Sequence, residues 1–268
     1  MTGGDDDTGS GDDGSGSNPG GGGDGCSDAS KLVYVVDENR TLSQFDPSQG
    51  TFKDLGQLSC PGGDMPFSMG VDRNANAWVL YNNGKVFKVD TTSLACTATN
   101  WTPTLELAQF GMGFSTNDVG GTTDTLFVAG GLGFDPNGNA QLATLDTASM
   151  TAADVGTVSG WPELTGNSNA ELWGWFPNDT HPRVEQIDKT TGSAIKTFKL
   201  DQLAGTPMDW AFAFYGGDYW IFLLKDSEPA TTVYQIDGTA GTVKSMLNTN
   251  TRKIVGAGVS TCAPVVIE

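Results

Sequence analysis

The stretch Val89-Asp90-Thr91 ends one apolar segment and begins a turn, and the same arrangement recurs along the chain. Its other copies are Phe45-Asp46-Pro47, Leu145-Asp146-Thr147, Ile187-Asp188-Lys189 and Ile236-Asp237-Gly238. Successive copies lie about 42 to 56 residues apart, a spacing typical of four-stranded β repeats, whereas helical repeats are usually shorter and rich in Leu and Ala. The sequence therefore predicts five copies of one β unit.

Each unit shows a small-residue strand, an apolar or aromatic strand, the Asp-ended strand and a polar outer strand. The first strands are predicted at 67–71, 110–114, 163–167, 210–214 and 255–259, and the second strands at 32–36, 77–81, 125–129, 171–175 and 218–222. Aligning the first strands gives a column of small residues, namely Gly70, Gly113, Gly166, Ala213 and Gly258. Small side chains let five inner strands converge on one axis. We therefore predict an all-β fold, a five-bladed β-propeller of four-stranded blades.

The two ends of the chain are predicted to share one blade. The unit that begins at Leu32 lacks a small first strand, and the C-terminus supplies an extra one from Val255 to Thr261. Pairing these pieces would close the ring over residues 31–268 and leave no free edge. The second strands are nearly continuous apolar runs, so we expect Trp78, Trp173 and Trp220 to fill interfaces between blades.

Residues 1–30 differ in composition from the rest of the chain. They hold seven Asp, no Lys or Arg, no aromatic residue and a run of Gly and Ser, which predicts a disordered tether. The net charge is −18, of which −11 remains without these seven residues, and such acidity disfavours nucleic acid or anionic membrane as partners. Neither a membrane-spanning segment nor a signal peptide is expected, because no apolar stretch of suitable length occurs.

The Asp/Gly/Ser-rich tether resembles the linker that follows the lipidated Cys of bacterial surface lipoproteins. Residues 31–268 resemble known five-bladed β-propellers, and the whole pattern resembles exported, often lipid-anchored, propeller proteins of Gram-negative bacteria. This resemblance implies an extracytoplasmic protein, secreted or tethered to the cell surface. It implies no activity, because a shared fold does not fix a function. Cys26 follows Gly and Asp rather than an apolar run, which argues against its own lipidation. We expect a monomer.

The four cysteines are even in number and lack a C-x-x-C spacing, and His181 is the one histidine in the sequence. This pattern favours two disulfides over a zinc site, and it indicates an oxidising compartment. We favour the pairs Cys26–Cys262 and Cys60–Cys96, because the first would join the two ends of a circular fold. The alternative is that one or more of the four are buried free thiols.

The repeated Asp residues suit a structural role. An Asp at a strand end accepts hydrogen bonds from the amides of the following turn, which accounts for all five copies at once. A catalytic or calcium-binding role would need one site rather than five equal ones.

Candidate binding residues gather where outer strands lead into inner strands, because in a propeller these connections share one face with those between second and third strands. Glu163 and Asp209 are the most informative, since each lies near a Trp where other units carry an apolar residue. Aromatic faces stack on pyranose rings and carboxylates accept hydroxyl protons, so such a mouth could bind a sugar. The candidate ligand-binding residues are Asp64, Trp161, Glu163, Asp209, Trp210 and Arg252, and Glu106 lies near the same mouth.

Two Asp-x-Asn-x-Asn stretches, Asp72 to Asn76 and Asp135 to Asn139, have the oxygen spacing that begins a calcium loop. Both lack the Gly at the sixth position and both suit hairpin turns, so we expect no cofactor, with calcium as the alternative. No Walker A, G-x-S-x-G or H-E-x-x-H motif is present. Longer loops are expected to add His181, Asp135, Asp179, Asp226 and Glu228 to the same face.

Three hypotheses follow from these residues. The leading one is an exported, non-catalytic recognition module whose acidic, aromatic mouth binds a carbohydrate or a protein loop. The second is a glycoside-active enzyme that uses Glu163 and Asp209, with Asp64 as a further candidate, as its carboxylates. No local motif of propeller glycosidases supports it, and solvated acids plus a buried Glu bonded to loop amides would explain the same residues. The third is a purely structural surface protein.

Overall fold

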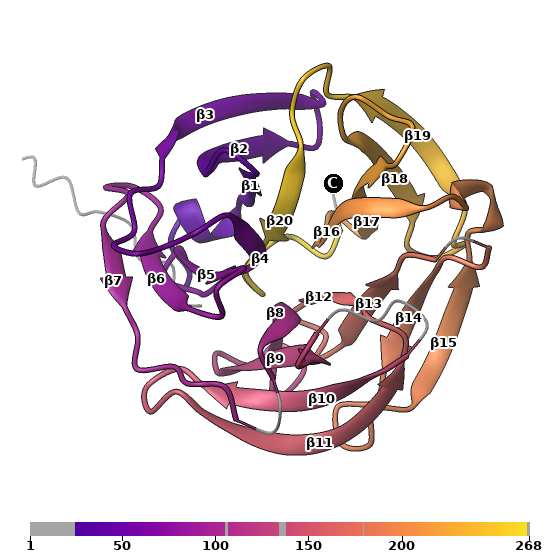
Figure 1. Ribbon diagram of the computed structural model, residues 1–268. Helices are drawn as coiled ribbons and strands as arrows, with labels where there is room; N and C mark the ends of the chain where they lie inside the picture. The colour runs from indigo at the N-terminus through magenta and orange to yellow at the C-terminus, as the bar shows by residue number, and fades with distance from the viewer. Residues whose placement is uncertain (1–24, 105–106, 134–137, 179, 267–268) are drawn as a thin grey trace, which may run out of the picture.

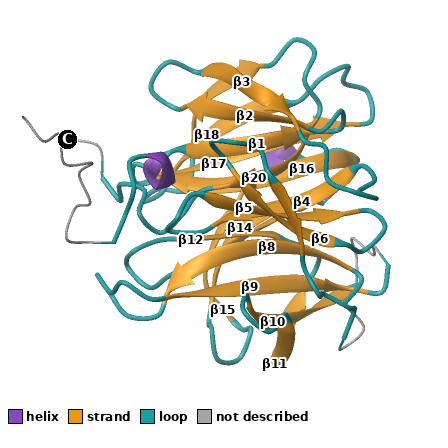
Figure 2. Cartoon of the chain, turned by 90° about the vertical axis from the view of Figure 1, so that its left-hand side faces the viewer, coloured by secondary structure: helices purple, strands orange, loops and turns teal. Residues whose placement is uncertain are grey.

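The computed structural model describes residues 25–104, 107–133, 138–178 and 180–266. In this part of the chain five four-stranded antiparallel sheets stand as blades around one axis (Figure 1). From the side, strands form the body and loops project from both faces (Figure 2). The predicted all-β, five-bladed propeller is confirmed. Residues 1–24 of the predicted tether lie outside the described residues, so that prediction stays open.

The blades are numbered in the order in which the chain first enters them, each listed from the axis outward. Blade 1 consists of β20 (Ile254–Gly258), β1 (Val33–Asp37), β2 (Thr41–Asp46) and β3 (Thr51–Gln57). Blade 2 consists of β4 (Pro66–Val71), β5 (Asn76–Tyr81), β6 (Val86–Asp90) and β7 (Cys96–Ala98). Blade 3 consists of β8 (Gln109–Thr116), β9 (Asp124–Gly131), β10 (Asn139–Asp146) and β11 (Thr151–Ser159).

Blade 4 consists of β12 (Glu163–Gly166), β13 (Leu172–Phe176), β14 (Arg183–Ile187) and β15 (Ala194–Lys199). Blade 5 consists of β16 (Pro207–Tyr215), β17 (Asp218–Lys225), β18 (Thr232–Asp237) and β19 (Val243–Asn248). The helices described are two short 3-10 turns, η1 (Ala29–Lys31) and η2 (Asp201–Leu203). Within the described ranges no helix is long and apolar enough to span a membrane.

The predicted closure of the ring is confirmed by the pairing of β20 with β1. Val35 lies opposite Ala257 and Val36 opposite Gly256 in an antiparallel register, so the last strand of the chain becomes the inner strand of the first blade. The first and last strands that the structure describes are thereby hydrogen-bonded to each other, and β20 covers the inner edge of β1.

The apolar core lies between blades rather than inside one layer. Five buried clusters are found in the described residues, and each joins two neighbouring blades. Trp78, Trp173 and Trp220 are all buried in these clusters, as predicted. The aromatic second strands therefore stabilise the ring mainly by excluding water from the interfaces, at about 25 cal/mol for each Å² of apolar surface buried.

The column of small residues has the predicted steric cause. A Cβ on Gly113 would lie 2.7 Å from the backbone of Leu164 in the next blade, and a Cβ on Gly258 would lie 2.8 Å from Val71. Both contacts are too short for a real side chain. At Gly113, Gly166 and Gly258 the inner strands can therefore approach this closely only without a side chain, whereas a Cβ on Gly70 would meet its nearest neighbour at an ordinary 3.4 Å.

The five repeated Asp residues cap turns, as predicted. Asp90 Oδ1 accepts hydrogen bonds from the amides of Thr92 (3.0 Å) and Ser93 (2.7 Å), and the other four copies bind the equivalent amides two and three residues later. For Asp90 the bonds from Ser93 and Thr92 hold the carboxyl pKa below its usual range.

Both predicted disulfides are formed. Cys26 pairs with Cys262 over 236 residues of sequence, and Cys60 pairs with Cys96 over 36 residues. The described residues contain no free cysteine. Two disulfides are typical of an extracytoplasmic protein, because thiols are kept reduced in the cytosol.

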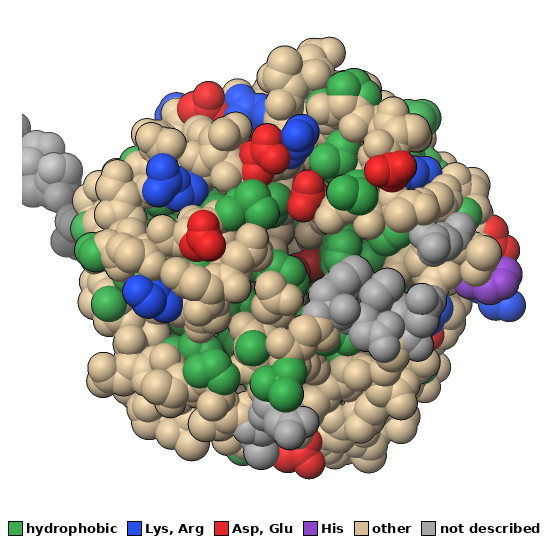
Figure 3. All heavy atoms as spheres, in the orientation of Figure 1, with side chains coloured by type: hydrophobic (Ala, Val, Ile, Leu, Met, Phe, Trp, Pro, Cys, Tyr) green, Lys and Arg blue, Asp and Glu red, His purple; other side chains and the backbone are tan. Residues whose placement is uncertain are grey.

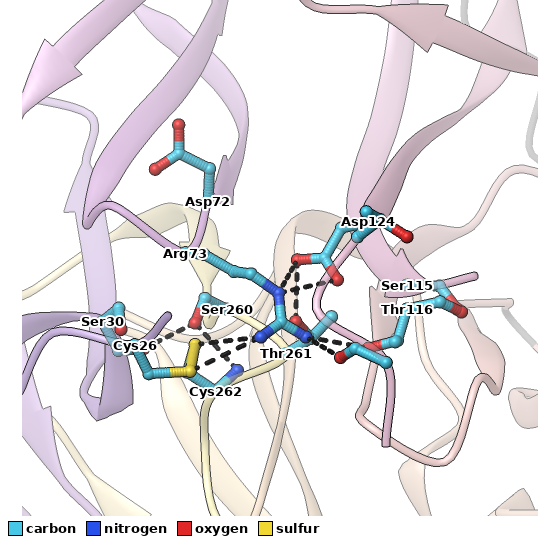
Figure 4. Close-up of polar contacts among 12 residues, drawn as sticks. Cys26, Ser30, Asp72, Arg73, Ser115, Thr116, Asp124, Ser260, Thr261 and Cys262 are labelled. Atoms are coloured by element: carbon cyan, nitrogen blue, oxygen red, sulfur yellow. Dashed lines mark hydrogen bonds and ion pairs between the residues drawn. A yellow bond between two sulfur atoms is a disulfide. The ribbon is translucent and has the colours of Figure 1, made fainter. Parts of the chain in front are cut away.

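A buried ion pair lies beside the terminal disulfide (Figure 4). Arg73 of blade 2 donates from Nε to both carboxylate oxygens of Asp124 in blade 3, at 3.1 and 3.0 Å, and its Nη1 lies 3.6 Å from Cys26 Sγ. Thr261, next to Cys262, donates to Asp124 at 2.7 Å. The side chains of Arg73 and Asp124 are only 13% and 7% exposed. This network joins three blades on one face of the ring.

We expect the terminal disulfide to contribute more stability than the other one. In the chain-entropy model the contribution grows with the logarithm of the loop, so the paired change Cys26→Ser and Cys262→Ser should cost roughly 1.5–2 kcal/mol more than Cys60→Ser with Cys96→Ser. Equilibrium unfolding in guanidinium chloride measures both variants. Equal losses of unfolding free energy would show that the terminal link does not restrain the open ring.

Breaking the buried pair should be costly and partly reversible. The change Arg73→Met leaves a buried carboxylate without its cation, so we expect a loss of about 3 kcal/mol in unfolding free energy. Adding Asp124→Leu should recover part of that loss, because both charges are then absent.

The exposed pair Lys31–Asp28 provides the control for this double-mutant cycle, since its side chains are 42% and 99% exposed. The change Lys31→Met should cost less than about 1 kcal/mol. Additive effects of Arg73→Met and Asp124→Leu would contradict a coupled pair.

Candidate functional site

All five blades contribute to one pocket at the end of the central axis. The cavity has a volume of about 250 Å³ and is mostly apolar, with four polar side chains. We call it the mouth pocket. The molecular surface is hollowed at this point, and acidic side chains lie at its rim and inside it (Figure 3). Its lining residues are Met65, Pro66, Phe67, Asn82, Gln109, Glu163, Met208, Asp209, Trp210 and Val255.

Two irregularities in the inner strands place apolar side chains at this pocket. The register of β4 with β5 shifts between Pro66 and Ser68, and that of β16 with β17 shifts between Pro207 and Asp209. Phe67 and Met208 occupy the extra positions. Such bulges re-aim side chains and are common next to functional sites. Met208 is 54% exposed and Met65, just before β4, is 38% exposed, so the rim presents apolar groups to water.

Asp209 and Trp210 lie side by side at the start of β16, and both are partly buried. Burial raises the pKa of the Asp209 carboxyl, and the nearby carboxylate of Glu38 raises it further. Lys253 opposes this effect, although its Nζ is 3.5 Å from Glu38 Oε1 and so is shared with that carboxylate.

Glu163 lies deeper, where it closes the axis. Its side chain is almost fully buried, and Ser68 of blade 2 donates to its Oε2 at 2.8 Å across the ring from blade 4. The amide of Met112 in blade 3 donates to Ser68 Oγ at 3.2 Å, so three blades meet at this carboxyl. Burial raises the pKa of Glu163 well above its usual range, and the hydrogen bond from Ser68 and the nearby amide of Met112 only partly oppose it.

The structure brings together three of the six residues that the sequence singles out for binding: Glu163, Asp209 and Trp210 line the mouth pocket. Asp64 is exposed beside Met65 and lines a second hollow, which shares Met65 with the mouth pocket. Trp161 is buried in the cluster between blades 3 and 4. Arg252 pairs with Asp54 at 2.8 Å and stacks over Phe52 with 5.0 Å to the ring centre, which ties it to blade 1.

The calcium alternative involves residues that already have partners. Asp72 Oδ1 accepts the amides of Asn74 and Asn76, both at 2.9 Å, and its Oδ2 accepts the Trp78 indole at 3.1 Å. Asp135, like Glu106 and Asp179, lies outside the described residues. Among the residues that are described, no three His, Cys, Asp or Glu side chains are grouped so that they could hold a metal ion.

Sequence reasoning missed the apolar half of the pocket and the partner of Glu163. Met65 and Met208 carry no motif, and their position depends on bulges that periodicity does not reveal. Ser68 is a polar residue inside a buried strand. Because buried hydroxyls need hydrogen-bond partners, its presence could have indicated a polar partner near the axis.

The sequence matches no protein-family model and no curated protein. Among solved structures, a protein of unknown function from Bacteroides caccae shares 11% identity, with 84% of each chain covered and a TM-score of 0.48. The chain titled "Structure of Dos1 propeller" shares 13% identity over 82% of this chain, with a TM-score of 0.44, and a chain of a mitotic checkpoint complex shares 13% over 83%, with a TM-score of 0.42. This chain spans only 56% and 62% of those two chains. Likeness at this level says nothing of function.

The buried carboxyl of Glu163 should make stability depend on pH. Its pKa is raised in the folded state, so the folded protein binds this proton more tightly than the unfolded chain does. The stability that the protonated Glu163 carboxyl contributes is therefore fully present below about pH 4.5, the ordinary pKa of a Glu side chain. It is lost as the pH rises toward the raised pKa of the folded state. Because Glu163→Gln keeps the shape without the titration, its unfolding free energy relative to wild type should increase with pH, by at most about 1.4 kcal/mol per pH unit.

Chemical denaturation between pH 4 and 8 measures this difference. Glu228→Gln, at a partly exposed loop position, is the matched control and should keep the wild-type pH dependence. A constant difference between Glu163→Gln and wild type over the whole range would contradict a buried titrating carboxyl.

Proposed function

We propose that this chain is an extracytoplasmic, non-catalytic recognition module that binds a segment of another protein at the mouth pocket. The supporting observation is that all five blades contribute to one pocket with an exposed apolar rim. Met65, Met208 and Trp210 present large apolar surfaces to solvent or near it, and such surfaces are typical of places where proteins bind proteins.

The alternatives receive less support from this geometry. A glycosidase would need two available carboxylates, yet Glu163 is buried and bonded to Ser68, and Asp64 does not line the pocket. A carbohydrate ligand is favoured by the side-chain amides of Asn82 and Gln109, which line the same pocket as Trp210. The methionine rim favours protein, and we make carbohydrate an outcome of the test. We further propose that the module is monomeric and is secreted or tethered to the cell surface by its acidic N-terminal segment.

Selection of displayed peptides and a glycan array on the full chain test this proposal. The selected peptides should bind wild type and lose affinity by about 30-fold with Trp210→Ala, because a central aromatic residue at an interface contributes about 2 kcal/mol. Trp210 also packs against the core between blades 4 and 5, so Met208→Ser serves as a second variant at a rim side chain that is 54% exposed.

Met246→Ser is the matched control, because Met246 is 67% exposed on β19, an outer strand far from the axis. It should leave binding unchanged. Glycan hits that Trp210→Ala abolishes would replace the protein ligand with carbohydrate. Peptides that bind all variants equally, or no ligand of either kind, would contradict recognition at the mouth and favour the purely structural hypothesis.

A further inference from the structure

The carboxylate of Asp209 lacks the partner that comparable carboxylates have in this fold. In the described part of the chain, it is the one partly buried carboxylate with neither a hydrogen bond nor an ion pair. Asp124 and Asp218, which are also shielded from water, are paired with Arg73 and Lys244 at 3.0 and 2.8 Å. A nearby cation stabilises a carboxylate that is partly shielded from water. A cationic group that enters the mouth pocket should therefore be stabilised by Asp209.

The walls around Asp209 suit a cation carried on an apolar stem. Trp210 and Phe67 supply aromatic surface, and Met65 and Met208 supply thioether groups at the rim. Lysine and arginine have this combination of an apolar stem and a charged end. A cavity of about 250 Å³ lies below the ~300–1,000 Å³ of typical small-molecule sites, so it suits one long side chain.

Two arginines of this chain are already held by an aromatic ring and a carboxylate together. Arg252 stacks over Phe52 while it pairs with Asp54. Arg183 stacks over Phe176, at 4.3 Å to the ring centre, while it pairs with Glu185 at 2.7 Å. At the mouth pocket the ring and the carboxylate are both present. Cation–π attraction and a charge-assisted hydrogen bond act together in such a set.

The long-range field also favours a positive ligand. The chain has a net charge of −18, and a field of this sign attracts cationic segments before contact. Lys253 is the cation that acts on Asp209 from within the molecule, and its ion pair with Glu38 limits how far it can serve Asp209 as well.

We propose that the mouth pocket takes a lysine or arginine side chain of the partner protein, with Asp209 as its counter-ion and Trp210 and Met208 against its stem. This inference rests on the proposed function and specifies the chemistry of the ligand. The partner segment inserts one cationic side chain along the axis, and the rest of the segment lies on the rim.

Short peptides test the inference directly. The probes are acetyl-Gly-Gly-Lys-Gly-Gly-amide, its arginine counterpart, and neutral counterparts with norleucine or Nε-acetyllysine. Binding is followed by NMR of the methionine methyl groups, with Met65 and Met208 assigned from Met→Leu variants. The cationic peptides should shift both signals in a saturable way, and the neutral peptides should bind at least tenfold more weakly.

Asp209→Asn and Asp64→Asn form a matched pair of variants. Both remove one negative charge near the mouth, but only Asp209 lines the pocket. Asp209→Asn should weaken binding of the lysine peptide by about tenfold or more, and Asp64→Asn by less than about twofold. Thermal unfolding checks that both variants fold.

Equal binding of the lysine and norleucine peptides to wild type would overturn the inference, and this comparison needs no variant. Equal losses with the two Asn variants would also overturn it, because only a diffuse charge effect would remain. If selected peptides without a cation bind at the mouth and lose affinity with Met208→Ser, the proposed function stands and the cationic ligand fails. If no peptide binds there, both fail.

Discussion

The antiparallel pairing of β20 with β1 is the contact on which the closed ring depends. It converts a linear series of sheets into a ring, in which each of the five interblade clusters is enclosed by two neighbouring blades. Without it, the cluster between blades 1 and 5 would lose part of its wall, since Ala257 and Val259 belong to it. The Cys26–Cys262 disulfide and the Arg73–Asp124 pair reinforce the closure on one face. Closing the ring also fixes how near the inner strands come to one another.

The close approach of the inner strands explains which residues lie at the centre of the ring. Glycine or alanine is needed where the inner strands crowd together, and elsewhere on these strands larger side chains fill the axis. Glu163 stands where the other inner strands carry Phe67, Phe110, Trp210 or Val255, and it reaches Ser68 across the ring. A buried carboxyl is costly unless it is hydrogen-bonded or protonated. The bond between Glu163 and Ser68 therefore holds blades 4 and 2 together at the axis, and the open pocket lies above Glu163. The mouth pocket is thus a consequence of how the ring closes.

Much of this architecture could be predicted from the sequence, because it depends on local patterns. The Asp90-type turns, the small-residue column and the apolar second strands each recur five times, and the cysteines have few possible pairings. The mouth pocket was harder to predict from the sequence. Trp161 and Trp210 both stand near the start of an inner strand, yet β12 begins after Trp161, whereas β16 begins before Trp210. Trp161 is buried between blades 3 and 4, whereas Trp210 is partly buried between blades 4 and 5 and also lines the pocket.

Arg252 does not line the mouth pocket, for a different reason. Its position before β20 suggests the mouth, but its partners Asp54 and Ser43 lie at the other end of the sequence, in strands that only ring closure brings near. Bulges at Phe67 and Met208 likewise change side-chain direction without a sequence signal. Residues whose environment depends on closure or on strand irregularity are those that periodicity cannot place.

The most direct test of recognition at the mouth is a crystal structure of the full chain bound to a selected peptide. The account predicts peptide density at the end of the axis, with a cationic side chain between Asp209 and Trp210 and the backbone over Met65 and Met208. A peptide bound instead along an outer strand or between two blades, with the mouth pocket unchanged, would contradict it.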